Sequence, residues 1–245
     1  MNSNFKLGSA YILICLIWGS TWLAIRLGLD SLTPFIGAGS RFLIAVLVFY
    51  LIMKIKKLQL QTDKESIKLY IQLGFFSYLI PFGLVYWGQQ YVATGLASVI
   101  FGIFPFFILI NSKFRLPNEN IGLLRVIGMI IAFCGIVIIF IEGFYKDFSF
   151  SVYGELAILL SAMMQAYTAV SIKKHGHHLN PWTMNLLPML IGGVGMLLIG
   201  FIFEDTSKLI FDEKAILSVL YLGVFGSVVT FTAYYWLMKD RKSVV

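Results

Sequence analysis

Eight runs of mostly apolar residues, each about twenty residues long, constrain the fold more than any other feature of the sequence. A helix of this length crosses the roughly 30 Å hydrocarbon core of a bilayer. Strands of a membrane barrel would alternate apolar and polar residues in segments of about ten, so the continuous runs exclude a barrel. The runs are residues 7–27, 35–53, 69–88, 91–110, 123–141, 152–172, 182–203 and 215–238.

The composition agrees with an integral membrane protein. Hydrophobic residues make up 59% of the chain, charged residues 13%, and the mean hydropathy is +0.86, whereas soluble domains contain roughly 45–50% apolar residues. The net charge of +7 is spread between the apolar runs rather than gathered on one soluble face, which argues against nucleic acid as a partner. We therefore predict an all-α polytopic membrane protein with eight transmembrane helices.

Lysine and arginine are distributed unequally between the two ends of the predicted helices. Fourteen lie on the side that includes the N-terminus and Lys6, and Arg41 lies inside a span. Because cytoplasmic loops carry the excess of basic residues, the N-terminus is predicted to be cytoplasmic and the protein to reside in the cell membrane. The first run is longer than the apolar region of a signal peptide, so it is predicted to be a retained helix. The basic residues of the other side are Arg26, Lys146, Lys208 and Lys214.

The third and eighth runs resemble each other at a constant offset of 149 positions. The segment "LGFFSYLIPFGLVYW" from Leu73 aligns with "LGVFGSVVTFTAYYW" from Leu222, which pairs Gly74 with Gly223 and Trp87 with Trp236. The repeated unit is therefore five spans long. An odd number of spans inverts the second copy relative to the first, as in many secondary transporters.

This repeat predicts two domains. Residues 1–145 would form the first repeat, of five helices, and residues 146–245 the second repeat, with three helices. By the same offset, counterparts of the fourth and fifth spans would follow the segment "KDRKSVV". We therefore interpret the chain as truncated before the last two of ten expected helices.

The segments "IWGSTWLAIRLGLDSLTPFIGAGSRF", "YWGQQYVATGLASVIFGIFPFF" and "NENIGLLRVIGMIIAFCGIVII" resemble EamA-type transporters of the drug/metabolite transporter superfamily. The resemblance covers the whole chain. It implies ten helices in two inverted five-helix repeats, cytoplasmic termini and a central substrate cavity between the halves. It also implies a direction, export, and a substrate class, small metabolites such as amino-acid-like solutes. The absent last pair of helices departs from the family pattern.

Arg41 is the first candidate for a substrate-binding residue, because it lies about six residues inside the second span. An unpaired charge at this depth costs at least a few kcal/mol unless it faces a cavity or a partner. The alternative is an arginine at the outer interface that extends its side chain to the lipid headgroups. For Arg26, at the outer end of the first span, simple interfacial anchoring is the stronger alternative.

Aromatic and amide side chains supply the other candidates for the cavity wall. Aromatic rings can hold apolar or cationic solutes, but aromatic residues near helix ends also form interfacial belts, an alternative that stays open for Trp87 and Trp236. Gln165 and Thr168 lie on one helix face and can either bind a solute or join helices. The full set is Trp18, Trp22, Tyr86, Trp87, Gln165, Tyr167, Thr168, Tyr235 and Trp236.

Three prolines inside spans are candidates for helix breaks: Pro81, Pro105 and Pro188. A proline lacks the amide donor and bends or interrupts a helix, which can free backbone groups for a solute or permit motion during transport. Ordinary kinks are the alternative.

Metal binding and catalysis are not expected. The loop "KKHGHH" holds three histidines beside two lysines, without a carboxylate or cysteine partner. Cys15 and Cys134 lie in apolar runs and are interpreted as small buried side chains. The paired carboxylates or nucleophile with a base that a membrane enzyme needs are not evident at membrane depth, and no cofactor is predicted.

The sequence thus predicts a secondary transporter, an exporter of small metabolites that works by alternating access. The alternative is a truncated fragment or partner subunit without transport activity. The expected partners are a small-molecule substrate and the lipid bilayer. A homodimer stays open, because helices that would pack on the missing pair would face lipid or another copy.

Overall fold

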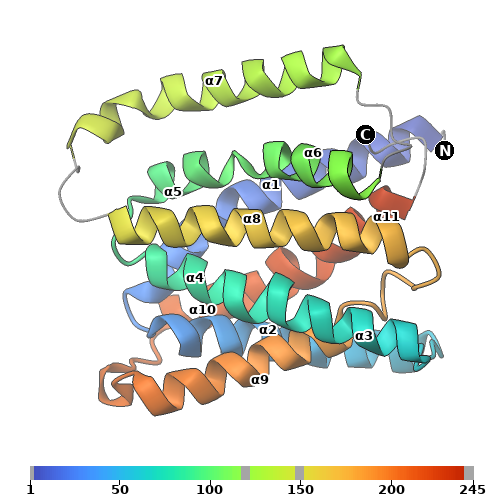
Figure 1. Ribbon diagram of the computed structural model, residues 1–245. Helices are drawn as coiled ribbons and strands as arrows, with labels where there is room; N and C mark the ends of the chain where they lie inside the picture. Colours follow the sequence, from blue (N-terminus) through green and yellow to red (C-terminus); the bar gives the residue numbers. More distant parts are fainter. Residues whose placement is uncertain (1–2, 117–121, 147–151, 240–245) are drawn as a thin grey trace.

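The computed structural model describes residues 3–116, 122–146 and 152–239, and within these ranges it is helical throughout, with short connections (Figure 1). The helices are α1 (Ser3–Leu29), α2 (Pro34–Ile55), α3 (Lys64–Leu73), η1 (Gly74–Leu79), α4 (Ile80–Gly88), α5 (Thr94–Phe101), α6 (Phe104–Arg115), α7 (Leu123–Lys146), α8 (Val152–His175), α9 (Leu186–Phe203), η2 (Thr206–Lys208), α10 (Glu213–Gly223), η3 (Val224–Val229) and α11 (Thr230–Lys239).

These helices form a polytopic bundle, as predicted. Seven segments are long and apolar enough to cross a membrane, and α7 contributes a shorter apolar helix, Val126–Gly135. Successive spans run in opposite directions, so α1 begins and α11 ends at the same end of the bundle (Figure 1).

Several predicted boundaries shift. The seventh span was expected to begin at Trp182, but α9 begins at Leu186, because the segment before it forms turns in which the Asn180 side chain accepts the backbone N–H of Trp182. The third and eighth spans begin earlier than expected, at Lys64 and Glu213, each one residue after an aspartate that caps the helix. Helix capping therefore extends these spans beyond their apolar cores.

Two spans contain a π-helical stretch. η1 joins α3 to α4 in the third span, and η3 joins α10 to α11 in the eighth. They begin at Gly74 and Val224, 150 positions apart, within one residue of the offset found in the sequence. A π-helical stretch leaves the regular hydrogen-bond ladder and often lies at functional sites.

Glycines allow the spans to approach closely. A Cβ atom on Gly39 of α2 would lie 3.0 Å from the Gly193 carbonyl oxygen of α9, and one on Gly88 of α4 would lie 2.7 Å from the Gly154 carbonyl oxygen of α8. Corresponding spans of the two predicted repeats make corresponding contacts. The third span contacts the sixth through α4 and α8, and the eighth contacts the first through α10 and α1. Small residues at helix crossings are the usual means of close packing in membranes.

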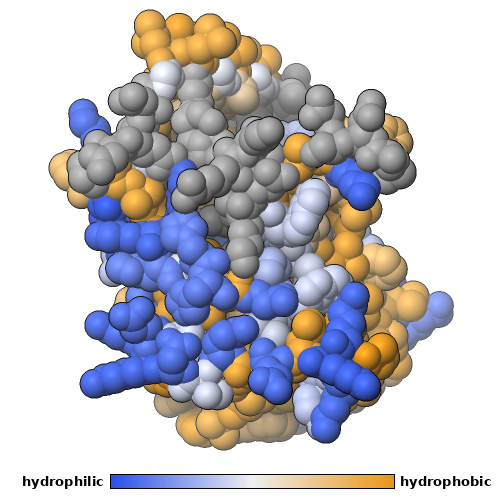
Figure 2. All heavy atoms as spheres, turned by 90° about the vertical axis from the view of Figure 1, so that its right-hand side faces the viewer, coloured by the Kyte–Doolittle hydropathy of each residue, from blue (hydrophilic) through white to orange (hydrophobic). Residues whose placement is uncertain are grey.

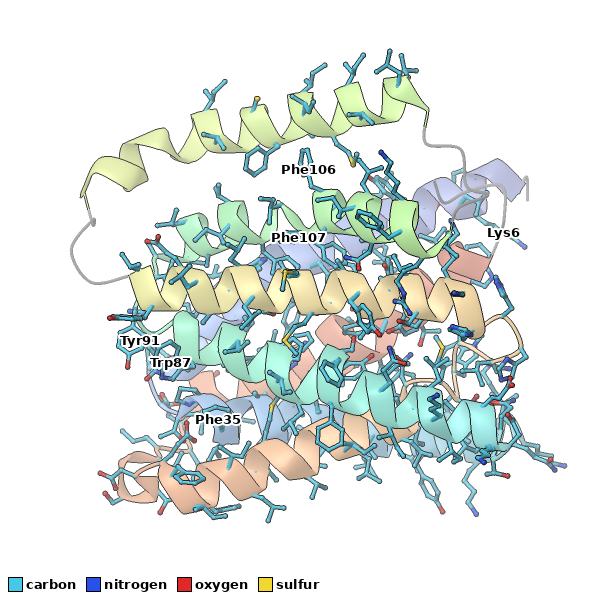
Figure 3. The ribbon with its side chains drawn as sticks, viewed as in Figure 1. Lys6, Phe35, Trp87, Tyr91, Phe106 and Phe107 are labelled. Carbon is cyan, nitrogen blue, oxygen red and sulfur yellow. The ribbon has the colours of Figure 1, made fainter. Side chains whose placement is uncertain are left out.

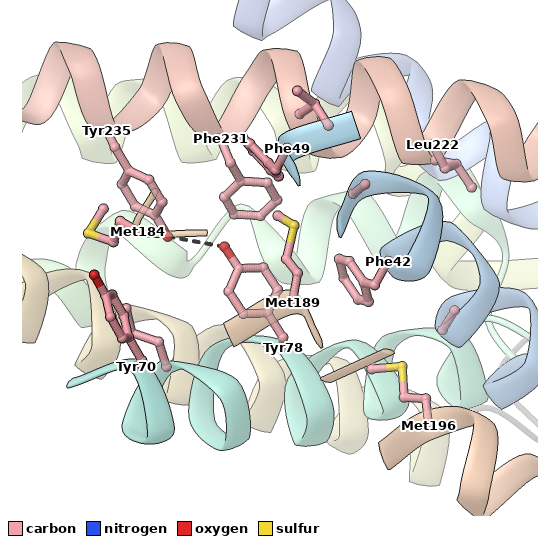
Figure 4. Packing of buried hydrophobic residues seen from close by; sticks show 14 of the residues in the cluster. Phe42, Phe49, Tyr70, Tyr78, Met184, Met189, Met196, Leu222, Phe231 and Tyr235 are labelled. Carbon is pink, nitrogen blue, oxygen red and sulfur yellow. Dashed lines mark hydrogen bonds between the residues drawn. The ribbon is translucent and has the colours of Figure 1, made fainter. Parts of the chain in front are cut away.

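A buried apolar and aromatic cluster fills the space between α2, η1, α9 and η3–α11 (Figure 4). Phe42, Tyr78 and Phe231 belong to it, and the Tyr78 hydroxyl lies 3.4 Å from that of Tyr235. Some residues of the cluster, Phe231 and Tyr235 among them, also line the cavity described below, which is bordered on another side by α5, α6 and α7.

Polar residues mark one end of the bundle. Figure 2 looks onto the end at which α3 begins and α8 finishes, and it shows hydrophilic side chains gathered there with hydrophobic ones around them. The side chain of Lys6 lies at this end, whereas Phe35, Trp87 and Tyr91 lie toward the opposite end (Figure 3). Arg241 and Lys242, two of the basic residues predicted to lie on the cytoplasmic side, lie outside the described residues.

Candidate functional site

A cavity of about 640 Å³ lies inside the bundle. Side chains from α1, α2, α8, the third to fifth spans and the eighth span line it. Its volume is in the range of small-molecule sites, and its lining is mostly apolar with a few polar groups, as is usual for such sites. The polar groups of the lining are therefore the candidates for specific contacts with a solute.

Arg41 is the one cationic side chain in the described lining, and only 2% of it is exposed. It lies about 10 Å along α2 from the first helical residue, at the 1.5 Å rise of an α-helix. Its guanidinium carbon lies 5.1 Å from the ring centre of Phe42 and 5.2 Å from that of Phe82. The structure thus places Arg41 at the cavity, buried inside the bundle.

The hydrogen bonds of Arg41 join α2 to two other spans. Its Nε and Nη2 donate to the Ser227 hydroxyl at 3.3 and 3.0 Å, Nη2 also donates to the Gly226 carbonyl oxygen at 3.3 Å, and Nη1 lies 3.5 Å from the Tyr86 hydroxyl. Gly226 and Ser227 belong to η3, where the π-helical backbone brings both groups to the guanidinium. Among the described residues, every acceptor of Arg41 is uncharged.

Aromatic rings form much of the cavity wall. Trp18 of α1 contacts two rings of α11, with centroids 5.6 Å from Phe231 and 5.3 Å from Tyr234. Trp22, one helical turn further, contacts Phe101 of α5 at 5.4 Å. The Trp18 pairs connect the two predicted repeats across the cavity, whereas the Trp22 pair lies within the first.

Polar side chains of α8 complete the lining. Gln165 donates to the Ser161 hydroxyl at 3.2 Å, and Thr168 donates to the Gln165 carbonyl oxygen at 2.9 Å and to the Ser77 hydroxyl of η1 at 3.3 Å. Thr168 is 1% exposed and already bonded, so it joins helices, while the partly exposed Gln165 stays the more accessible of the two.

The structure brings together some of the predicted site residues and separates others. One group lines the cavity: Trp18, Trp22, Arg41, Pro105, Gln165, Thr168 and Tyr235. A second group does not: Pro81, Tyr86, Trp87, Tyr167, Pro188 and Trp236. Tyr86 nevertheless supports the site, because its hydroxyl faces Arg41.

The remaining aromatic candidates lie away from the cavity. Trp87 contacts Tyr91 at the end of α4, at 5.1 Å between ring centroids (Figure 3). Tyr167 is 40% exposed and lies under the guanidinium of Arg115, 4.2 Å from its ring centre. Trp236 is also 40% exposed and borders a separate apolar groove. The positions of Trp87 and Trp236, near the ends of α4 and α11, fit the alternative of interfacial aromatic residues.

The three prolines differ in their effects. Pro105 follows a break at Gly102 and Ile103, where the fourth span divides into α5 and α6. Pro81 lies near the start of α4, directly after η1. Pro188 lies in the first turn of α9 and interrupts nothing, because amide groups of a first turn lack intrahelical partners in any case.

Sequence reasoning missed the two closest partners of Arg41. Gly226 and Ser227 carry no signal of their own, since a glycine or serine in an apolar span is most often a packing residue. Phe231 had a signal, because the repeat pairs it with Phe82, and both rings line the cavity. The structure also shows no group of three or more metal-ligating side chains among the described residues.

The fold and the cavity define a class: a polytopic helical membrane protein with an internal solute-sized cavity. Residues 7–141 and 152–244 match the model of the EamA-like transporter family, and the chain belongs to this family.

Relatives that match most of the chain include two that are named as transporters and one that is named only as a protein. An uncharacterized transporter of Buchnera aphidicola is 30% identical over 235 residues, which cover 95% of this chain and 77% of that protein. The uncharacterized transporter YoaV of Bacillus subtilis is 29% identical, with 94% and 78% covered, and the protein PagO of Salmonella typhimurium is 30% identical, with 95% and 76% covered.

The fold also has a match among solved structures. One crystal structure superposes with a TM-score of 0.77, at 19% identity, over 96% of this chain and 80% of that one. At this identity the match supports the fold alone.

Proposed function

We propose that the protein is a secondary transporter that exports small metabolites, such as amino-acid-like solutes, across the cytoplasmic membrane by alternating access. The observation that carries this proposal is the cavity between the two predicted repeats, residues 1–145 and 146–245, with aromatic walls and the buried cation Arg41. Membership of a transporter family supports the general activity. The substrate class and the direction rest on the family resemblance.

The orientation is part of the proposal. The end at which α3 begins would face the cytoplasm together with the N-terminus, because it carries the excess of lysine and arginine. The opposite end, with Trp87 and Tyr91, would face outward.

Alternating access requires contacts that close one end of the cavity while the other is open. At the proposed cytoplasmic end, the Ser66 hydroxyl lies 2.8 Å from His178 Nε2, and the Thr183 hydroxyl donates to the Gln61 side chain at 2.9 Å. Both contacts join residues 1–145 to residues 146–245. Their rupture would open this end.

Equivalent contacts exist at the other end. The Glu204 carboxylate accepts the backbone N–H groups of Phe35 at 2.9 Å and Ile36 at 3.2 Å, at the N-terminus of α2, where a negative charge is stabilised. The Ser31 hydroxyl donates to Asp212 at 2.8 Å. The proposed cycle alternates between loss of these outer contacts and loss of the cytoplasmic ones.

The test compares the metabolites that cells release with and without the chain. We expect at least one small solute to accumulate in the medium of expressing cells, and Trp22→Ala to reduce this accumulation about tenfold, the effect of one lost aromatic contact of about 1.4 kcal/mol. Trp87→Ala is the matched control, because Trp87 lies outside the cavity. If membrane-inserted wild type released nothing beyond empty cells, the transporter proposal would be wrong.

A further inference from the structure

The guanidinium of Arg41 is a buried cation without a described counter-ion. The cavity lining among the described residues includes no aspartate or glutamate, and the acceptors of Arg41 are two hydroxyl groups and one carbonyl oxygen. A buried charge is normally compensated by an opposite charge, because desolvation strongly penalises an isolated ion. Within the described lining, the positive charge of Arg41 therefore has no negative partner.

The existing hydrogen bonds of Arg41 compensate this charge weakly. Three of the four are 3.3 Å or longer, beyond the usual 2.7–3.2 Å of an N–H···O bond. A guanidinium has five N–H donors in a planar fork, and carboxylates match this fork with shorter and roughly twofold stronger bonds. A carboxylate that enters the cavity would thus be a better partner than the groups now present.

The aromatic rings of the cavity wall suit the apolar part of such a solute. The Phe82 ring lies 5.2 Å from the Arg41 guanidinium and 6.4 Å from the Phe231 ring. Trp18 and Tyr234 extend this aromatic surface along the cavity wall. A solute with a carboxylate at one end and an apolar body at the other would satisfy the cation and cover the rings.

We propose that Arg41 binds the carboxylate of the transported solute, and that this carboxylate takes the place of Ser227 as the acceptor of the guanidinium. This inference rests on the proposed transport function and adds the chemical class of the substrate: monocarboxylates with an apolar body, including zwitterionic amino acids.

The exchange of acceptors links binding to the helices that must move. In the structure, Arg41 of α2 holds η3 through Gly226 and Ser227, and the Ser227 hydroxyl itself donates to the Leu222 carbonyl oxygen at 2.8 Å. When a carboxylate takes the place of Ser227, α2 and η3 lose the Ser227 part of this connection and keep the bond to Gly226. Substrate binding then loosens one contact between the two predicted repeats.

The test measures binding of matched solute pairs to the purified chain in lipid nanodiscs by equilibrium dialysis, with empty nanodiscs subtracted. The probes are the N-acetyl derivatives of leucine, methionine and phenylalanine, each as the free carboxylate and as the uncharged amide. We expect wild type to bind at least one carboxylate about tenfold or more tightly than its amide, as a charged hydrogen bond of about 1.5–3 kcal/mol implies.

Variants assign this preference to Arg41. Arg41→Gln should bind both members of a pair equally, and Arg41→Lys should keep part of the preference, because it retains the charge without the fork. Arg26→Gln is the matched control: this exposed arginine donates to the Gln89 carbonyl oxygen at 3.2 Å and lies outside the cavity lining. It should behave like wild type.

Ser227→Ala tests the exchange of acceptors. Removal of the competing hydroxyl should raise carboxylate affinity about twofold to fivefold, within the net worth of one hydrogen bond. An unchanged or lower affinity would show that the carboxylate does not replace Ser227.

The carboxylate assignment is overturned if wild type does not distinguish carboxylate from amide, if it binds neither, or if Arg41→Gln keeps the preference in a chain that elutes as a single folded species. The metabolite-release assay separates this failure from failure of the transporter proposal. Release that depends on the chain, without carboxylate preference, would leave the transporter standing and remove the role of Arg41.

Discussion

The third and eighth spans, Lys64–Gly88 and Glu213–Lys239, have the same backbone features but differ in the side-chain contacts that they make. Each begins after an aspartate cap: Asp63 accepts the Ser66 backbone N–H at 3.0 Å, and Asp212 accepts that of Ala215 at 2.8 Å. The two aspartates lie 149 positions apart, the offset of the sequence repeat, and each span contains a π-helical stretch.

The two π-helical stretches differ in the hydrogen-bond partners of their residues. In η1, the Tyr78 hydroxyl donates to the buried Asn185 side chain at 2.8 Å. Tyr78 also packs within the buried cluster shown in Figure 4. In η3, Gly226 and Ser227 accept hydrogen bonds from Arg41; Gly226 also lines the cavity, as does Ser77 of η1. The same backbone irregularity thus stabilises the bundle in one span and holds the candidate substrate ligand in the other. This difference indicates that the site arises where the repeats diverge.

The largest effect should come from filling the glycines at the start of the two stretches: Gly74, the first residue of η1, and Gly223, the last residue of α10 directly before η3. A Cβ on Gly223 would lie 2.8 Å from the Ile44 side chain and 3.0 Å from the Arg41 carbonyl oxygen, and a Cβ on Gly74 would lie 2.8 Å from Ile191. We expect Gly223→Leu and Gly74→Leu to lower the free energy of unfolding by about 1–3 kcal/mol. Gly223→Leu should lower the free energy of unfolding more than Gly74→Leu, because a backbone oxygen can move away from the new side chain less easily than another side chain can.

Thermal unfolding of the purified variants in detergent measures this prediction. Gly8→Leu is the control, since a Cβ there has no neighbour within 4 Å. Equal melting temperatures for Gly74→Leu, Gly223→Leu and Gly8→Leu would contradict the close approach.

A smaller effect should separate the two stretches by function. Tyr78→Phe removes the donor to Asn185 and should cost about 1–2 kcal/mol of stability, the penalty of an unsatisfied buried acceptor. It should leave the carboxylate preference unchanged, because Tyr78 does not line the cavity. Ser227→Ala should do the reverse and alter carboxylate affinity more than stability. If both variants changed the same property, the two stretches would not differ as described.

The smallest effect concerns the capping aspartates. Hydrogen bonds from the Ser66 side chain and backbone hold the pKa of Asp63 below its usual value, and the Ala215 backbone N–H and Ser31 lower the pKa of Asp212. Because each folded-state pKa is depressed, the stabilisation is complete above about pH 4 and is lost as the pH falls through the folded-state pKa.

Asparagine isolates this effect, since it caps helices but does not ionise. The melting temperature of wild type should therefore fall more steeply below about pH 4 than that of Asp63→Asn or Asp212→Asn. Parallel curves in all three proteins would contradict the assignment.

The comparison also shows how far the sequence predicts the site. Trp18, Trp22 and Arg41 were predicted from depth within a span, and all three line the cavity. The repeat pairs Trp87 with Trp236, yet both residues lie outside the cavity lining. A sequence repeat preserves position along the chain and does not say which way a side chain faces.

The sequence by itself determined the helical class, the spans and the family, because run length and composition are local properties and a span must satisfy its own backbone hydrogen bonds in lipid. Only the tertiary structure decided how each helix is rotated and that Ser227, 186 positions away, is a partner of Arg41. The physical reason is that lipid-facing and core-facing surfaces are both apolar, so no polar stripe in the sequence sets the rotation of a membrane helix.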